Sequence, residues 1–238
     1  MNTDLLVMAV TRLSDGVCVA CLDQQNRWVR PTQENARGWR QLTVGHLKDR
    51  TGRLVVQPGN LIRWDLGRPI PRDVHTEDVL VGNESPTLLR ALPPDEFRRR
   101  CEAVEDPSLA SFLRGTDQSL TLIRPQSIGD IQFLNEGKGN LKSRMRITHG
   151  GHTEHRSAMD LYWRALGRQV LTKLKSPSVL WTPRALLHKT GLAIESLVIG
   201  RGQAYEAQNH PLAGAYWPLI VGVLTHPPNT TAVDYSNL

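Results

Sequence analysis

Three positively charged residues at alternate positions form the group in this sequence best suited to chemistry. Lys142, Arg144 and Arg146 follow a glycine-containing loop that also carries Lys138. In a β-strand, alternate side chains point to the same face, so these three cations would share one face. A continuous cationic face suits a phosphate backbone and is unfavourable inside a core. We therefore predict a nucleic-acid contact here, with a plain solvent-exposed face as the alternative.

The segment around these residues is strongly basic. The chain carries 29 Lys and Arg against 23 Asp and Glu, a net charge of +6 at pH 7. Residues 138–189 contain eleven of these cations and only two acids. Within this segment, Arg164 and Arg168 lie about one helical turn apart and would neutralise further phosphates. A solvated basic face and a dock for an acidic protein are the alternatives.

Binding of unpaired bases calls for aromatic side chains on which the bases stack. The candidates are Trp28, two positions before Arg30, and Trp163 in the basic segment. In a strand, Trp28 and Arg30 would share a face, which suits one base and one phosphate. Trp28 could equally fill the interior of a barrel. The other aromatic candidates are Trp39, Trp64, Phe133 and Trp181.

Metal-binding patterns are weak. His149, His152 and His155 could hold zinc, but the glycine pair between the first two favours a flexible basic loop, and no cysteine pair or HExxH pattern supports a metal centre. Cys18 and Cys21 would point to opposite faces of a strand, which indicates a structural role. We expect no bound metal and no cofactor.

Catalytic patterns are weaker still. Glu77-Asp78 is a carboxylate pair of the kind that magnesium-dependent nucleases use, although strand polarity explains it equally well. The sequence contains no P-loop, no GxSxG and no GxGxxG followed by an acid. We assign no catalytic residue. A nuclease or a nucleic-acid-modifying enzyme is one alternative, and a scaffold or nucleotide-sensing subunit is another.

Short β-rich segments separated by turns must position these residues. The first third of the chain has turn signals about every 8–12 residues, which is typical of a small barrel or sandwich. Apolar residues at helical spacing predict helices over 93–104 and 156–174, the second amphipathic with a basic outer face. A domain boundary is expected near Gly115. The expected strands are 4–11, 17–23, 28–31, 52–57, 61–66, 74–81, 119–123, 128–134, 141–148, 192–199 and 217–225.

The composition narrows the setting. With 39% hydrophobic and 22% charged residues, the chain can bury a core. No apolar run approaches the length of about 18 residues that a membrane helix needs. Three cysteines cannot complete a disulfide framework, and the acidic start is unlike a secretory leader. We expect a cytoplasmic protein without a membrane partner.

Several stretches resemble one prokaryotic family. The opening VMAVTRLSDGVCVACLDQQNRWVRP, with LIRWDLGRPIP and HTEDVLV, is similar to the start of the dual OB-fold domain family. Near the end, SLVIGRGQAYE and YWPLIVGVL are similar to its closing strand pair, although Arg201-Gly202-Gln203 replaces the expected acid-proline pair.

This resemblance implies two OB-like small β-barrels, nucleic-acid binding and a setting in bacterial conflict or antiviral loci. We therefore expect a mostly β protein with added helices (α+β). Residues 1–115 would form one barrel with a C-terminal helical insert, and residues 116–238 a second barrel with the amphipathic basic helix. The expected function is non-catalytic binding of single-stranded DNA or RNA with weak sequence specificity. The protein would act as an accessory or sensor beside a separately encoded effector protein.

Overall fold

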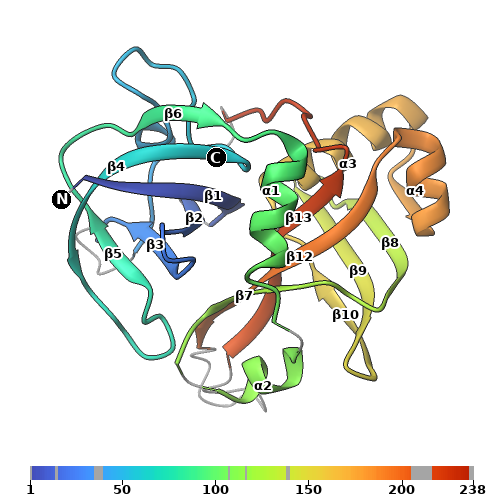
Figure 1. The fold of residues 1–238 in the computed structure, drawn as a ribbon. Helices are drawn as coiled ribbons and strands as arrows, with labels where there is room; N and C mark the ends of the chain where they lie inside the picture. Colours follow the sequence, from blue (N-terminus) through green and yellow to red (C-terminus); the bar gives the residue numbers. More distant parts are fainter. Residues whose placement is uncertain are drawn as a thin grey trace.

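Strands dominate the computed structural model, and four α-helices accompany them in the part of the chain that the structure describes (Figure 1). This confirms the predicted fold class, mostly β with added helices. No helix among the described residues is long and apolar enough to span a membrane. The structure describes residues 2–13, 16–34, 40–106, 108–115, 117–137, 140–204 and 216–235.

The N-terminal strands close into a five-stranded barrel. Their bounds are β1 Asn2–Arg12, β2 Val17–Leu22, β3 Trp28–Thr32, β4 Asn60–Pro69 and β5 Asp78–Val81, with β6 Thr87–Ala91 beside β4. β1 pairs with both β2 and β4, and β3 pairs with β5 in parallel, which completes the circuit. Such a small five-stranded barrel is typical of the OB-fold.

β1 is covered on both of its faces. Every residue from Leu5 to Val10 is buried, and Val7 belongs to the core inside the barrel. Leu6 and Met8 instead pack with residues of the second half of the chain. A strand buried on both faces needs an almost continuous apolar sequence, which explains why this segment shows no polar alternation.

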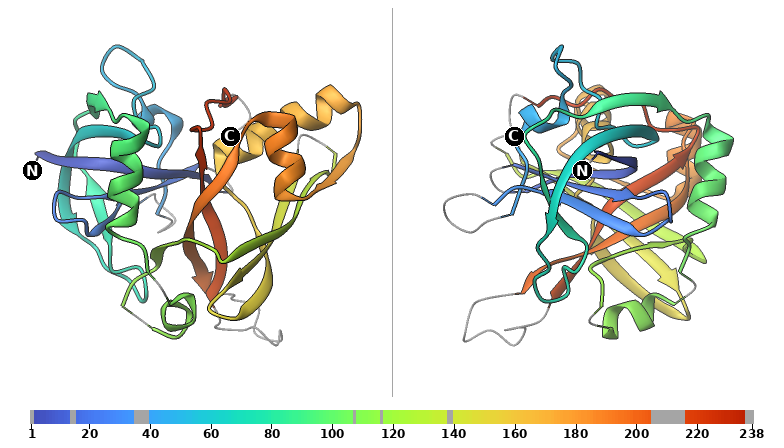
Figure 2. Two further views of the ribbon diagram at one scale, coloured as in Figure 1. Left: turned by 45° about the vertical axis from the view of Figure 1, so that its right-hand side comes forward. Right: turned by 60° about the vertical axis from the view of Figure 1, so that its left-hand side comes forward.

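The second half of the chain forms two sheets. Strands β8, β9, β10 and β11 form the order β10-β9-β8-β11, and β7, β12 and β13 form the order β13-β12-β7. A bridge between Ala158 and Ile220 links β13 to the end of β10. β12 and β13 lie between the barrel and the four-stranded sheet (Figure 2). The bounds are β7 Leu120–Ile123, β8 Ser127–Asn135, β9 Leu141–His149, β10 His152–Ser157, β11 Ser178–Trp181, β12 Ala193–Ala204 and β13 Tyr216–His226.

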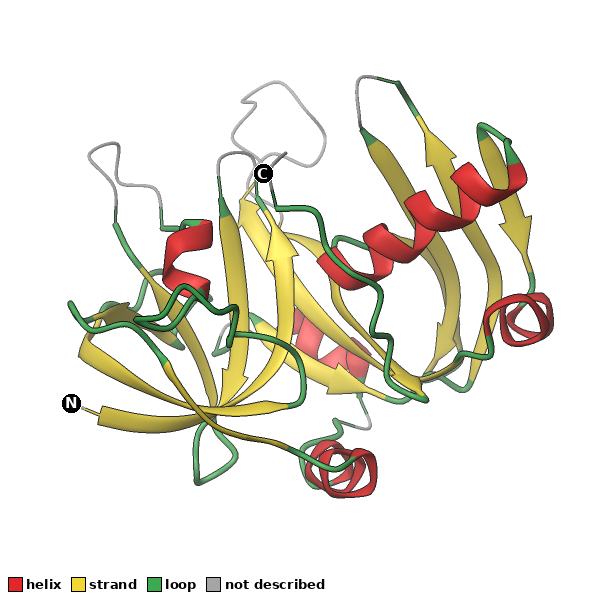
Figure 3. Ribbon diagram, turned by 90° about the horizontal axis from the view of Figure 1, so that it is seen from above, coloured by secondary structure: helices red, strands yellow, loops and turns green. Residues whose placement is uncertain are grey.

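Helix α3 covers one face of the four-stranded sheet (Figure 3). The Asp160 carboxylate accepts a hydrogen bond from the backbone N–H of Trp163 and so caps its N-terminus. Gly167 allows the helix to approach the sheet, because a Cβ atom there would lie 2.4 Å from the Phe133 ring. The helix bounds are α1 Pro94–Glu102, α2 Leu109–Arg114, α3 Leu161–Leu174 and α4 Pro183–Thr190, with one 3-10 turn at Val44–Leu47.

Two predicted elements are wrong. Residues 52–57 form no strand. Leu54 makes only an isolated bridge to Lys48, and Val55 and Val56 lie in a loop with their side chains buried. Residues 152–157 form β10 rather than a loop and the start of a helix, so α3 begins at Leu161. Gly150 and Gly151 adopt positive φ angles and make a tight β9–β10 hairpin instead of a flexible loop. The division near residue 115 stays a prediction.

Asp160 joins α3 to β13. Its carboxylate accepts hydrogen bonds from the backbone N–H of Trp163 at 2.7 Å and of Val223 at 3.2 Å. The residue is 2% exposed. Burial raises the pKa of Asp160 from 3.8 to about 7, against the opposing effect of these N–H donors.

This raised pKa makes stability depend on pH. Between about pH 4 and pH 7 the folded state keeps the Asp160 proton, whereas the unfolded state releases it. The free energy of unfolding therefore falls as the pH rises through that range. Asp160→Asn keeps an acceptor oxygen but does not titrate. We expect the free energy of unfolding, measured with urea at several pH values, to fall less steeply in this variant. Asp95→Asn at an exposed position is the control, and parallel profiles for wild type and Asp160→Asn would contradict the assignment.

Candidate nucleic-acid interface

The three predicted cations of β9 share one face of the strand, as expected. Lys142 is half-buried, and Arg144 and Arg146 are exposed. The intervening Ser143 and Met145 are buried toward α3. The alternation confirms that the cationic side chains project from the face of the sheet opposite the helix. Lys138 lies outside the described residues.

Acidic residues partly neutralise this cationic face. Lys142 Nζ lies 3.0 Å from Glu136, and an Arg146 guanidinium nitrogen lies 3.3 Å from Asp130. Both pairs are solvent-exposed, so each stabilises the fold little and can be exchanged for another anion. Among the described residues, Arg144 has no ion pair. The face therefore retains cationic groups that a phosphate can reach.

A cavity of about 680 Å³ lies on the outer face of the barrel, between the two halves of the chain. Its barrel wall comes from β2, β3, the end of β1 and the loop before β5, the region where OB-folds bind oligonucleotides. Its opposite wall comes from β9, α3, β12 and β13. Lys142 lines this cavity as well as standing on the cationic face. The volume falls within the usual range for small-molecule sites, about 300–1,000 Å³.

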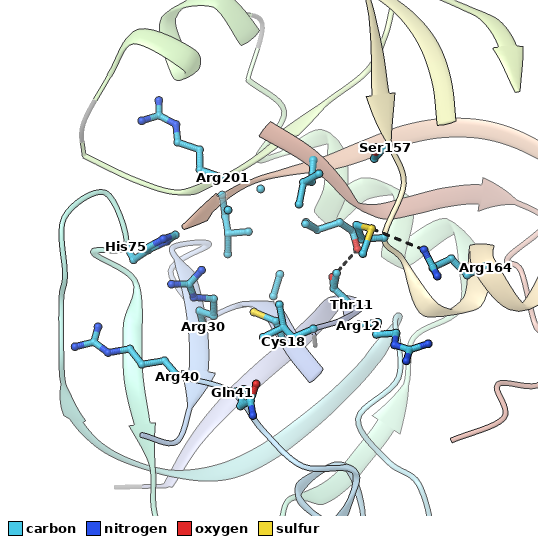
Figure 4. Close-up of a pocket in the computed structure, with 18 of the residues that line it drawn as sticks. Thr11, Arg12, Cys18, Arg30, Arg40, Gln41, His75, Ser157, Arg164 and Arg201 are labelled. Atoms are coloured by element: carbon cyan, nitrogen blue, oxygen red, sulfur yellow. Dashed lines mark hydrogen bonds between the residues drawn. The ribbon is translucent and has the colours of Figure 1, made fainter. Parts of the chain in front are cut away.

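Positive charge predominates in the cavity (Figure 4). Among its described lining residues, seven are Arg or Lys and three are Asp or Glu. The cations are Arg12, Arg30, Arg40, Arg72, Lys142, Arg164 and Arg201, and the acids are Asp73, Asp78 and Glu136. Three of these cations, Arg30, Lys142 and Arg164, are predicted from the sequence. The other four, Arg12, Arg40, Arg72 and Arg201, are not, because distant segments meet here without any local motif.

Asp78 holds the barrel side of the cavity together. Its carboxylate is fully buried and contacts Arg30 Nε at 2.5 Å and Arg40 Nη1 at 3.0 Å. The parallel pairing of β3 with β5 places Arg30 directly beside Asp78. Burial and the nearby Arg30 charge lower the pKa of His75 to about 4, so its imidazole is neutral at pH 7. Because Asp78 pairs with Arg30, the positive charge of Arg30 in the cavity is already neutralised.

Neither predicted tryptophan provides a platform in this cavity. Trp163 is fully buried, its Nε1 donates to Ser143 Oγ at 3.0 Å, and its ring packs 5.2 Å from that of Phe133. The prediction that Trp163 stacks a base is therefore wrong. Trp28 is half-buried against the core that includes Phe97 of α1 and does not line the cavity. Trp39 lies outside the described residues.

The sequence predicts Arg164 on an exposed basic face of α3, and this prediction is wrong. Arg164 is 4% exposed and lines the cavity, because α3 packs against the end of β1. Burial, with the neighbouring charges of Arg168 and Arg12, lowers the pKa of Arg164 to about 10. Its guanidinium therefore remains charged at neutral pH. Arg168 is half-buried beside it.

The predicted carboxylate pair does not face a common site. Glu77 accepts hydrogen bonds from Ser119, and Asp78 is bound by two arginines. Cys18 lines the cavity whereas Cys21 is buried in the barrel, which confirms that they point to opposite faces.

The three predicted histidines have different surroundings. His149 is buried and contacts the Arg124 carbonyl, whereas His152 and His155 are exposed. No group of three or more His, Cys, Asp or Glu suited to a metal ion occurs among the described residues.

The closed five-stranded barrel is that of an OB-fold protein. A model of the dual OB-containing domain matches residues 3–180, which is most of the chain. The chain therefore belongs to the dual OB-containing domain family. The stretches SLVIGRGQAYE and YWPLIVGVL lie beyond the matched residues. A search of curated proteins found no match.

We expect Asp78→Asn to destabilise the fold strongly. The change leaves the half-buried guanidinium groups of Arg30 and Arg40 without their counter-charge. Loss of one partner of a fully buried ion pair costs about 3–5 kcal/mol, which is the upper bound here. Urea denaturation would show this as a lowered midpoint. Asp73→Asn, an exposed acid on the same cavity, is the matched control and should change the free energy of unfolding by less than about 0.5 kcal/mol. Equal midpoints for the two variants would exclude the role assigned to Asp78.

Proposed function

We propose that this protein binds single-stranded DNA or RNA, without cleaving it and with little sequence preference. The observation that carries the proposal is the continuity of two features through Lys142. This residue stands at one end of the cationic face of β9 and also lines the cavity on the ligand face of the OB barrel. A single-stranded nucleic acid lying along β9 would therefore lead into the cavity.

Phosphate contacts supply the affinity in this proposal. Arg144 and Arg146 follow Lys142 at intervals of about 6.7 Å along the strand, so their side chains can contact successive backbone phosphates. Such contacts position a nucleic acid but carry no sequence information. The cavity adds aliphatic surface from residues such as Ala20, Leu219 and Val221, against which a base can pack. Weak sequence preference follows from this arrangement.

We further propose that the protein works in the cytoplasm as an accessory or sensor subunit beside a separately encoded effector. The support is the resemblance to the dual OB-fold domain family, which implies a setting in bacterial conflict or antiviral loci. Co-purification of the protein with products of neighbouring genes would test this partner, and purification of the protein alone under gentle salt conditions would count against it.

The double variant Arg144→Glu plus Arg146→Glu tests the binding surface. It reverses two charges on the cationic face and leaves every described lining residue of the cavity unchanged. We expect fluorescence anisotropy with labelled single strands, between about 50 and 200 mM salt, to show at least tenfold weaker binding. The slope of log K against log salt should become shallower by roughly 1 to 2 units.

Lys173→Glu plus Lys189→Glu is the matched control. It changes the net charge equally, at exposed positions on α3 and α4. Equal losses of affinity in the two double variants would show that only net charge matters. Absence of binding by the wild type to any DNA or RNA would refute the proposed function.

A further inference from the structure

Arg164 is the feature of the cavity that the fold alone does not explain. Within the described part of the chain, no carboxylate lies within ion-pair distance of its guanidinium. Nη1 lies 3.8 Å from the Met159 sulfur, and Nε is buried without a hydrogen-bond partner. The acid that acts on it electrostatically, Glu136, already pairs with Lys142. A charged group buried to this extent is costly unless an anion joins it.

The neighbouring charges increase this cost. Arg12 and Arg168 both act on Arg164 as repelling positive charges. Arg12 lines the same cavity and stands at the end of β1, where that strand meets α3. Close-up views place Arg12 and Arg164 on the side of the cavity away from Arg30 and Arg40 (Figure 4). This side therefore carries unneutralised positive charge, whereas Asp78 compensates the other side.

We propose that the cavity binds a nucleotide bearing a phosphate monoester and that Arg164 anchors this phosphate. The inference rests on the proposed function and specifies the ligand of the same surface. A guanidinium offers paired N–H donors that match phosphate oxygens. The monoester carries a charge of about −1.5 to −2, which suits Arg164 and Arg12 together better than the single charge of an internal phosphodiester.

The position of Arg164 also favours a terminal phosphate. The residue is 96% buried, so a phosphate must enter the cavity to reach it. An internal phosphate would need room for the strand to enter and leave, whereas a terminal phosphate needs one path only. The cavity volume of about 680 Å³ accommodates one nucleotide of this kind. A free mononucleotide and the phosphorylated end of a strand present the same chemistry.

The test compares oligonucleotides of one sequence that end in 5′-phosphate, 3′-phosphate or hydroxyl only, in anisotropy titrations with the full chain. Nucleoside 5′-monophosphate and the matching nucleoside serve as free competitors. We expect at least one phosphorylated end to bind tenfold or more tightly than the hydroxyl form, as for a charge-assisted contact. In Arg164→Met, this ratio should fall below about twofold. The double variant Arg144→Glu plus Arg146→Glu should weaken all forms and preserve the ratio.

Arg164→Met should fold, because it replaces an unpaired buried charge by an apolar side chain of similar length. An unchanged or raised thermal midpoint would confirm that Arg164 is retained for binding rather than for stability. Equal binding of all three oligonucleotides, with no competition by mononucleotide, would overturn the inference and leave the proposed function standing. Binding of mononucleotide without binding of any strand would refute the proposed function and retain the nucleotide site.

Discussion

The burial of β1 on both faces is the constraint on which the rest of the structure depends. One face of this strand completes the barrel, and the other supports the sheet of β12 and β13. The two layers approach so closely that a Cβ atom on Gly222 would lie 2.8 Å from Ala9 Cβ. Thr11 Oγ1 also donates to the Val221 carbonyl at 3.0 Å. The two halves of the chain are therefore joined by a packed core, not only by a linker.

The cavity is a consequence of this junction. The close apolar contact between the halves ends near Thr11, where charged side chains join the aliphatic ones on both walls. The barrel wall offers the outer surface of β2 and β3, and the second half contributes β9 and α3. An OB barrel alone presents an open face, whereas here the second half covers that face and leaves a cavity of about 680 Å³. The cationic strand β9 then leads outward from it.

The sequence predicts features that depend on neighbouring residues. Alternation in 141–148 predicted the shared face of Lys142, Arg144 and Arg146. Prediction from the sequence failed where the burial of a residue depends on distant segments. Trp163 fits any amphipathic helix, and only the packing of α3 on Phe133 shows that its ring is inaccessible.

The cavity itself left no local signal, because its charged residues come from segments spread between positions 12 and 201. Pairing of cavity charges depends in the same way on tertiary contacts. Asp78 follows Glu77 in a segment that resembles a nuclease carboxylate pair, yet the β3–β5 pairing turns it into the partner of Arg30. The chemistry of such a residue is thus decided by the strand beside it rather than by its sequence neighbours.

The half-buried Arg30 and the buried Arg164 have different roles within one cavity. Arg30 forms an ion pair with Asp78 and supplies its counter-charge. This pair fixes the register of β3 against β5, although its net contribution to the free energy of unfolding is modest. Arg164 has no such partner among the described residues, and its burial costs several kcal/mol of a total stability that is typically 5–15 kcal/mol. A fold tolerates that cost when the large apolar surface of a doubly buried strand offsets it. The core around β1 therefore makes possible a charged site that a smaller barrel could not hold.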